Sequence, residues 1–390
     1  MKKNIEIERL RGVAILLVLL QHLSISSAVF STLGFDTRKM PFYLGVHIFF
    51  VISGYVVAKS FISKGLNVKL FYAKRIFRIL PLIVFFVVLS AFLNIFRIYF
   101  SVQWKDFFQD SAAVLGGYFV SPFYKTHGIY NFGAMWSLSV EMQFYLVFLL
   151  LMVICIKLCR LGVKRLLLFF GILYMSIAVI LRLAMAGIIT LKLPALLQHI
   201  SIWKFDFLVL GVLLCLGNTV KGKYLITPSN TRRRLLNLLY PALIIVPCII
   251  SYLSGSVHDG YRQSWFLNTA GFGIFGISFF VLLSLAIRGQ DLITVHPLID
   301  RVLAYFGSRS YSLYVLHFPS FVIIWICLNL LTPKIFSISP VYYTVAQTLM
   351  FIAVGVPMAE FAHRYIEKPG IRLGDLIISR YNIGGTTANN

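Results

Sequence analysis

The chain has 390 residues, of which 59% are hydrophobic and only 13% are charged, and its mean hydropathy is +0.86. So much apolar surface excludes a single water-soluble core and predicts a membrane protein with several spanning helices. Thirty-six Lys and Arg residues outnumber thirteen Asp and Glu residues, which gives a formal net charge of +23. Because the basic residues lie between apolar segments and no nucleic-acid-binding motif accompanies them, we expect membrane lipids rather than nucleic acid as their partners.

Apolar segments of spanning length set the predicted architecture. They lie at 9–27, 41–62, 80–100, 136–156, 166–189, 200–217, 236–254, 265–287, 310–331 and 341–363. If the N-terminus is cytoplasmic, Lys and Arg concentrate in the cytoplasmic loops at every turn, as the positive-inside rule requires. We therefore predict an all-α, polytopic bundle of about ten helices with both termini in the cytoplasm. The membrane domain would cover 1–372, and 373–390 would be a short, disordered cytoplasmic tail.

Two connecting segments are longer than tight turns. Residues 65–79 place bases and large apolar residues at helical spacing, which predicts a short basic helix at the cytoplasmic interface. Residues 101–135 are aromatic, contain glycine and are too interrupted for a span. They predict an extracytoplasmic aromatic loop, either a lid or a re-entrant segment.

The first apolar segment has Arg11 near its start and His22 within it. Eleven residues correspond to ~16 Å of helical rise and roughly 20° less than three turns, so both side chains would share one face. An ionisable residue inside a membrane is costly unless it has a partner or lines a cavity. His22 is therefore a candidate catalytic residue, and a structural hydrogen bond to a neighbouring helix is the alternative.

Arg75 and Arg78 lie three residues apart in the sequence KRIFRILP, on one face of the predicted basic helix. Together with Arg11 they would gather three guanidinium groups at the cytoplasmic end of the protein. Such a group suits a polyanionic ligand such as the phosphates of a nucleotide. Anchoring to lipid headgroups is the alternative explanation.

Three further polar residues lie within apolar segments: Glu141, Asp206 and His317. A carboxylate at the depth of Glu141 must be paired, protonated or exposed to a cavity, so it is a candidate for the site or for a helix-packing ion pair. Asp206 is a candidate acceptor-binding residue or an interfacial residue. His317 precedes Pro319 by two residues, so its ring has a structural alternative in bonding backbone groups that the proline frees.

The sequence favours neither a metal site nor a disulfide framework. None of the cysteines forms a CxxC pair or lies at metal-ligand spacing from a histidine. The five are Cys155, Cys159, Cys215, Cys248 and Cys327. The GxSxG, HExxH and P-loop motifs are absent from the sequence.

Over about residues 5–372 the chain resembles the acyltransferase 3 family of bacterial integral-membrane O-acyltransferases. The resemblance rests on the order and spacing of several short motifs rather than on any one of them. These are Arg11 with His22, FFVISGY at Phe49–Tyr55, KRIFRILP with Arg75 and Arg78, WSLSVEMQFYL around Glu141, SYSLYVLHFP around His317, and YIEKP around Glu367. Met142 departs from the pattern, because the family often has a second glutamate there.

The resemblance implies transfer of an acyl group, usually acetyl from cytoplasmic acetyl-CoA, to a hydroxyl of a cell-surface glycan. Lipopolysaccharide O-antigen, exopolysaccharide or a lipid-linked saccharide precursor would be the acceptor, and the protein would lie in the bacterial cytoplasmic (inner) membrane. The family's functional residues carry over onto Arg11, His22, Arg75 and Arg78. Acetyl-CoA would be a substrate, and no cofactor is expected. Some members have a C-terminal esterase-like domain, which we do not expect in this chain.

The residues and the resemblance suggest one mechanism. Arg11, Arg75 and Arg78 would bind the phosphates of acetyl-CoA, and its pantetheine arm would bring the thioester to His22. His22 would act either as a general base or as a nucleophile that forms an acyl-imidazole. Glu141 would orient the imidazole or bind sugar hydroxyls. A transporter of a glycan or lipid-linked sugar is the alternative from another functional class.

Overall fold

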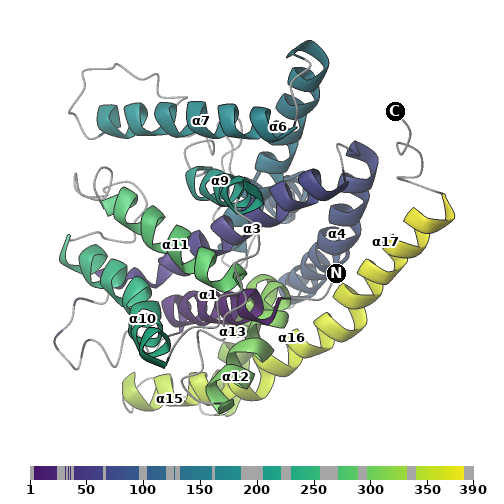
Figure 1. Cartoon of the computed structure of the whole chain (residues 1–390). Coiled ribbons are helices and arrows are strands. Elements are labelled where there is room, and N and C mark those ends of the chain that lie inside the picture. Colours follow the sequence, from purple (N-terminus) through teal and green to yellow (C-terminus); the bar gives the residue numbers. More distant parts are fainter. Residues whose placement is uncertain are drawn as a thin grey trace. The chain divides into compact units, whose positions relative to one another are not determined.

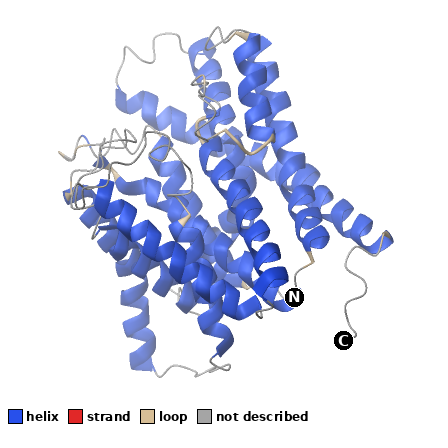
Figure 2. Ribbon diagram, turned by 90° about the horizontal axis from the view of Figure 1, so that it is seen from above, coloured by secondary structure: helices blue, strands red, loops and turns tan. Residues whose placement is uncertain are grey.

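The computed structural model describes residues 4–23, 31, 34, 36, 39–64, 67–95, 103–119, 127, 132–159, 163–185, 205–220, 230–254, 271–288, 297–331 and 340–381. Every regular element within these residues is a helix, which confirms the all-α fold class (Figure 2). Four of the described helices are long and apolar enough to cross a membrane: Pro41–Ile62, Val68–Ile95, Ser310–Leu328 and Tyr342–Arg380. Asp206–Gly217, Leu238–Leu253 and Gly273–Ile287 are shorter apolar helices. The count of ten spans stays a prediction.

The chain divides into two compact units. Unit 1 contains Met1–Lys59, Ile154–Gln198 and Ile202–Ser310, and unit 2 contains Ser60–Val153, His199–Ser201 and Tyr311–Asn390. Unit 1 is built from α1 (Ile5–His22), η2 (Pro41–Tyr43), α3 (Leu44–Lys64) up to Lys59, α7 (Val163–Met185), α9 (Asp206–Val220), α10 (Asn230–Leu253), α11 (Phe272–Ile287) and α12 (Pro297–Ser308). Its α-helices are labelled in Figure 1.

Glycines set the closest helix contacts of unit 1. Gly12 of α1 lies against the carbonyl of Leu303 in α12, and Gly307 of α12 lies against the carbonyl of Glu8 in α1. A Cβ atom at either glycine would collide with that backbone oxygen. Gly54 of α3 approaches the backbone of α9 at Leu208 in the same way. Membrane helices use small residues for such contacts, because close backbone approach supplies the packing that the hydrophobic effect does not.

Unit 2 is built around α4 (Val68–Ile95). The other elements are α5 (Trp104–Leu115), α6 (Met135–Cys159) up to Val153, α13 (Ser310–Leu331) from Tyr311, and the successive helical segments α15 (Pro340–Met350), η6 (Phe351–Gly355), α16 (Val356–Ala362), η7 (His363–Glu367) and α17 (Lys368–Arg380). The last five segments follow one another without interruption through Arg380 (Figure 1). Stacked and edge-on aromatic rings fill much of this core, for example Phe86, Phe107 and Phe132.

The structure differs from the sequence prediction at residues 65–79. Their described part does not form a separate interfacial helix but the first turns of α4, which continues past Pro81 to Ile95. Proline usually ends a helix because it lacks an N–H and its ring crowds the preceding turn. Transmembrane helices tolerate it where neighbours bond the freed backbone groups. In the turn before Pro81, Tyr311 of α13 also donates its hydroxyl proton to the carbonyl of Ile79, 2.8 Å away, which ties α13 to α4 beside the proline.

Two predicted loops contain helices. In the segment 101–135, residues Trp104–Leu115 form α5, which ends where Gly117 adopts a φ of 72°. Part of the predicted lid, including residues 120–126 and 128–131, lies outside the described residues. The predicted cytoplasmic loop 288–309 contains α12. Both helices are only twelve residues long, too short for the spanning-length criterion that identified the other helices.

Candidate active site

Arg75 lies between two aromatic rings in unit 2. Its guanidinium carbon is 4.1 Å from the ring centre of Phe71, one turn earlier on α4, and 4.5 Å from that of Tyr145 on α6. Both distances are within the range of cation–π attraction, which is strongest for Arg when the pair is shielded from water. The side chain is half-buried. The two rings therefore fix the plane of the guanidinium group before any ligand arrives.

Tyr145 links Arg75 to Glu141. Its hydroxyl donates to the carboxylate of Glu141, which lies one turn earlier on α6. Residues four apart on a helix share a face, so α6 presents both groups together. Glu141 is half-buried. The buried Tyr314 hydroxyl bonds Ser137 at 2.5 Å and the carbonyl of Ala134 at 2.9 Å.

Arg78 is exposed and lies near a second buried carboxylate, Glu367. The positive charge of Arg78 attracts the carboxylate of Glu367. The Oε2 atom of Glu367 accepts the hydroxyl proton of Ser312 at 2.7 Å and lies 2.9 Å from Nδ1 of His363. His363 and Glu367 bound a π-helical turn, a distortion that is frequent at functional sites. The structure thus connects Arg75 to Glu141 through Tyr145 and places Arg78 near Glu367, and the sequence analysis had placed neither Tyr145 nor Glu367 in the site.

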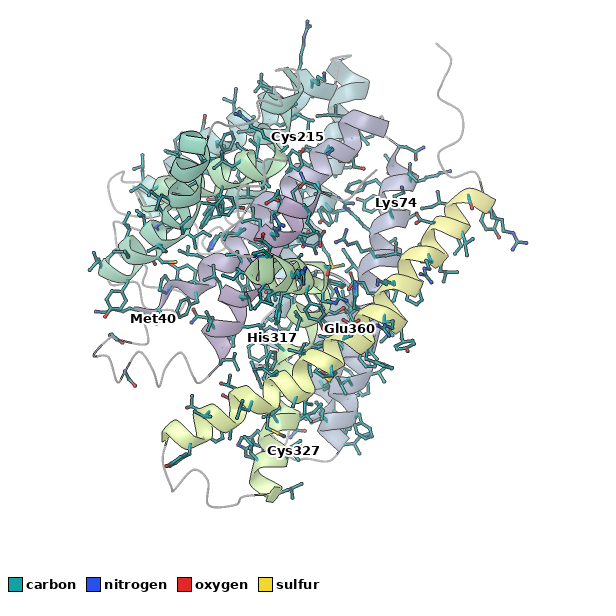
Figure 3. All side chains as sticks on the ribbon, turned by 60° about the horizontal axis from the view of Figure 1, so that its bottom comes forward. Met40, Lys74, Cys215, His317, Cys327 and Glu360 are labelled. Carbon is teal, nitrogen blue, oxygen red and sulfur yellow. The ribbon has the colours of Figure 1, made fainter. Side chains whose placement is uncertain are left out.

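His317 has the contacts of a structural residue. Only 1% of it is exposed, and its Nδ1 atom lies 2.7 Å from the carbonyl of Tyr314 on the same helix. Its ring packs against Phe318 at 4.6 Å and Phe321 at 5.8 Å between ring centres. These contacts fit the structural alternative. Figure 3 labels His317 and, on the C-terminal helix, Glu360, which pairs with Arg364 at 3.4 Å.

In unit 1, Arg11 belongs to a set of charges along the first turns of α1. Its Nη1 atom is 3.4 Å from the carboxylate of Glu8, one turn earlier. Arg9 pairs with Glu6 at 2.6 Å and with Asp300 of α12 at 3.5 Å. The three carboxylates are buried, so their ion pairs offset part of the cost of removing charge from water. Arg11 is half-buried beside them.

His22 is the last residue of α1 rather than a mid-helix residue, because the helix is shifted toward the N-terminus relative to the predicted segment 9–27. Asn4 caps the start of α1, where its Oδ1 atom accepts the N–H of Glu6 at 2.9 Å. At the other end, the Gln21 side chain accepts the N–H of Tyr43 at 3.1 Å. His22 is half-buried where the chain leaves the helix.

Asp206 is the first residue of α9 and is 2% exposed. Its Oδ1 atom accepts the N–H of Phe207 at 3.1 Å. A carboxylate at a helix N-terminus is stabilised by the unpaired N–H groups and by the helix dipole. This position fits a helix-terminating role for Asp206.

The sequence-predicted residues fall in both units. Arg11, His22 and Asp206 lie in unit 1, and Arg75, Arg78, Glu141 and His317 lie in unit 2. The structure adds Tyr145, Tyr311, Ser312, His363 and Glu367 to the surroundings of the unit 2 arginines. Two signals for them were present in the sequence: Glu141 with Tyr145, and His363 with Glu367, are i,i+4 pairs on apolar helices.

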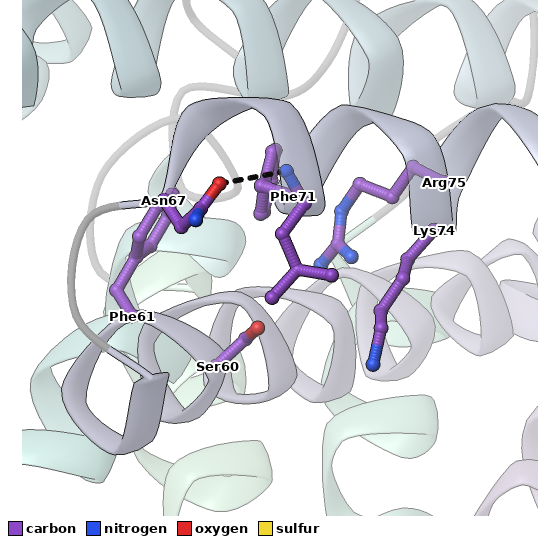
Figure 4. A pocket seen from close by; sticks show the side chains of 7 residues that line it. Ser60, Phe61, Asn67, Phe71, Lys74 and Arg75 are labelled. Carbon is purple, nitrogen blue, oxygen red and sulfur yellow. Dashed lines mark hydrogen bonds between the residues drawn. The ribbon is translucent and has the colours of Figure 1, made fainter. Parts of the chain in front are cut away.

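A pocket opens beside Arg75 in unit 2. It contains about 300 Å³ of space, part of it open to the outside, and lies between the end of α3 and the start of α4. Its lining residues are Ser60, Phe61, Asn67, Leu70, Phe71, Lys74 and Arg75. Figure 4 shows the side chains of Lys74 and Arg75 extending from α4 toward α3, which carries Ser60. Two cations beside hydroxyl and amide groups suit an anionic ligand. No group of three or more His, Cys, Asp or Glu residues in the described part of the chain is arranged to hold a metal ion.

Comparisons with known proteins identify the family of the chain. O-acetyltransferase OatA of Staphylococcus aureus strain NCTC 8325 is 25% identical over 354 residues, covering 84% of this chain and 52% of the relative. The "Putative peptidoglycan O-acetyltransferase YrhL" of Bacillus subtilis strain 168 is 23% identical, covering 93% of this chain and 54% of the relative. The chain thus spans about half the length of these curated relatives, and no solved structure matches it. The acyltransferase domain family matches residues 4–360, so the chain belongs to the acyltransferase 3 family of membrane proteins.

Proposed function

We propose that the protein is a membrane O-acetyltransferase that moves acetyl from acetyl-CoA to a hydroxyl of a cell-surface glycan. Family membership supports the reaction class, and the relatives named O-acetyltransferase support acetyl as the group transferred. The pocket with Lys74 and Arg75 is the observation that carries the proposal, because an acyltransferase with a CoA donor needs a cationic site for its phosphates.

In this proposal Lys74, Arg75 and Arg78 bind the donor's phosphate groups, and Arg11 contributes a further donor contact. The aromatic rings around Arg75 hold its planar fork ready to engage two phosphate oxygens. Arg11 must exchange its bond to Glu8 for the ligand, or share it. The expected donor enters from the cytoplasm, where the basic residues of the predicted topology concentrate.

His22 supplies the chemical step in this proposal. As a general base it would take the proton from the sugar hydroxyl while the oxygen forms a C–O bond to the acetyl carbonyl and the C–S bond to CoA breaks. As a nucleophile it would first form an acetyl-imidazole, from which the sugar oxygen takes the acetyl group. In both routes CoA leaves as a thiolate, and the proton of the sugar hydroxyl ends on its sulfur to give the free thiol. Glu141 orients a reacting or binding group through its bond to Tyr145.

The acceptor in this proposal is a glycan outside the cytoplasm. Peptidoglycan, the substrate in the printed name of the Bacillus relative, joins lipopolysaccharide O-antigen, exopolysaccharide and lipid-linked saccharides as candidates. All of them present sugar hydroxyls close to the membrane. The proposed location is the bacterial cytoplasmic membrane, with both termini in the cytoplasm.

The test is acetyl transfer by the purified protein in detergent or liposomes. The protein is incubated with radiolabelled acetyl-CoA and each candidate glycan, and the label in the glycan is measured. We expect label in one glycan class, released by mild base as an ester would be. Movement of a glycan across liposomes without labelling would overturn the proposal in favour of a transporter.

A further inference from the structure

In unit 2, Asp110 of α5 pairs with His127, and neither residue has been discussed so far. Asp110 is 0% exposed, and the Nδ1 atom of His127 lies 3.0 Å from its Oδ1 atom. The backbone N–H of His127 donates to both carboxylate oxygens of Asp110, at 3.3 Å each. A carboxylate only accepts hydrogen bonds, so Nδ1 carries the proton between the two side chains.

The burial of Asp110 shows that the pair is built rather than incidental. An isolated carboxylate without exposure to water would be very costly, and the bonds from His127 offset that cost. They also use both carboxylate oxygens, which leaves the ring of His127 in one orientation with Nε2 pointing away from Asp110. This is the usual way in which a carboxylate sets the tautomer of a functional histidine.

The outward side of the ring meets a second carboxylate, and both groups are accessible. Nε2 of His127 lies 3.5 Å from Oδ1 of Asp106, one turn before Asp110 on α5. The His127 side chain is 30% exposed and the Asp106 side chain is 34% exposed. A ligand can therefore reach an imidazole nitrogen and a carboxylate oxygen at the same time. Groups able to hydrogen-bond both are neighbouring hydroxyls, such as those of a sugar ring.

The other exposed face of α5 indicates where this pair lies relative to the membrane. Trp104 and Phe108, four residues apart, are 43% and 64% exposed. Exposed aromatic side chains with a polar opposite face are typical of the boundary between lipid and water. The saccharide of a lipid-linked or surface glycan would approach at that boundary, and α5 belongs to the segment predicted to be extracytoplasmic.

We propose that His127 and Asp106 form a binding site for hydroxyl groups of the saccharide acceptor, with Asp110 as the positioning residue that holds His127. The inference rests on the proposed acetyltransferase function and assigns its acceptor side. The competing role is a structural latch, in which His127 only fastens its segment of chain to α5.

The test compares kinetic constants of purified variants with the glycan that the wild-type protein acetylates. His127→Gln and Asp106→Asn remove the imidazole and the carboxylate at similar size, and Asp110→Asn removes the positioning charge. Losing a hydrogen bond to a charged group corresponds to about tenfold to a hundredfold in affinity. We expect the apparent KM for the glycan to rise by that factor in all three variants. The KM for acetyl-CoA should stay unchanged in all three variants, and the thermal unfolding midpoint should stay unchanged in Asp106→Asn.

Gln109→Ala, an exposed position on the same helix, is the matched control and should change neither KM. Unchanged glycan KM in folded His127→Gln and Asp106→Asn would overturn the inference. A parallel rise in both KM values with a lower unfolding midpoint would assign the latch role instead. If the wild-type protein acetylates no glycan, the proposed function fails and this inference falls with it.

Discussion

At the level of single residues, Arg75 and Arg78 differ in their surroundings, because Arg75 stacks between two aromatic rings and Arg78 is exposed. A cation–π contact contributes about 0.5–1 kcal/mol when exposed and ~2 kcal/mol or more when desolvated, and Arg75 makes two. Removing either arginine should cost about 1.5–3 kcal/mol of donor binding, a loss of roughly tenfold to a hundredfold in affinity. Lysine should rescue less at Arg75 than at the exposed Arg78, because it loses both the planar fork and the stacking.

The measurement is acetyl-CoA binding to the purified Arg75→Lys, Arg75→Ala, Arg78→Lys and Arg78→Ala variants. Lipid anchoring makes the opposite prediction, since arginine and lysine would then be nearly interchangeable at about 1 kcal/mol each against an anionic leaflet. If all four variants bound acetyl-CoA as tightly as the wild-type protein does, phosphate binding by these residues would be ruled out, even if acetylation in cells fell.

His22 is the last residue of α1, and substitutions there can distinguish a catalytic role from a structural one. We expect His22→Ala to lower acetyl transfer by about a hundredfold to ten-thousandfold, the usual contribution of a positioned acid–base group. His22→Asn should be equally inactive, because an amide hydrogen-bonds but neither takes up a proton nor carries an acetyl group. Activity is compared at equal amounts of folded, membrane-inserted protein. A structural histidine would instead leave the asparagine variant active, and that outcome would remove His22 from the mechanism.

Between elements, the crossing of α1 and α12 is the contact that places Arg11. The two backbones meet at Gly12 and Gly307, and neither has room for a Cβ atom. We expect Gly12→Ala and Gly307→Ala to lower the thermal unfolding midpoint, because overpacking typically costs about 1–3 kcal/mol and here backbone must move. Gly273→Ala on α11 is the control, since its Cβ would meet nothing within 4 Å. It should be neutral or slightly stabilising, as alanine favours helix more than glycine does. Equal midpoints for all three variants would contradict the close crossing.

Elements with a long apolar signal were predictable from the sequence, and those decided by tertiary contacts were not. The segments 41–62 and 310–331 match α3 and α13 closely, because length and hydropathy alone define them. Helix α12 was missed, since its twelve residues are stabilised by packing on α1 rather than by lipid. The separate interfacial helix predicted at 65–79 was wrong, because its described part continues through Pro81 as the start of α4.

The candidate site shows the same division. The polar residues that interrupt apolar helices could be identified from the sequence, because charge within a membrane is costly wherever it occurs. Their partners could not be assigned without coordinates. The carboxylate of Glu367 bonds Ser312 and His363, whereas Arg364, three residues from Glu367, pairs with Glu360. His127 has no apolar context to mark it, and only its bonds to the buried Asp110 distinguish it.

For the whole molecule, the distribution of positive charge decides from which side of the membrane the donor and the acceptor are proposed to bind. Orientation in the membrane follows the excess of Lys and Arg in short loops rather than net charge, and acidic residues contribute little. In this chain the loops predicted to be cytoplasmic hold most of the 36 basic residues. The pocket with Lys74 and Arg75 lies in one of these predicted cytoplasmic segments. Helix α5, whose Asp110 pairs with His127, lies in a segment predicted to be extracytoplasmic. The donor and acceptor sides of the proposed reaction therefore depend on one topology.

Single cysteines test that topology in a background from which the five natural cysteines have been removed. Lys69, Lys105 and Lys164 are all exposed, at the starts of α4, α5 and α7. We expect Lys105→Cys to react with a membrane-impermeant thiol reagent added to intact cells. Lys69→Cys and Lys164→Cys should react only after the membrane is permeabilised. The reverse pattern would place Arg75 outside the cell, where acetyl-CoA is absent, and would therefore overturn both the orientation and the proposed donor.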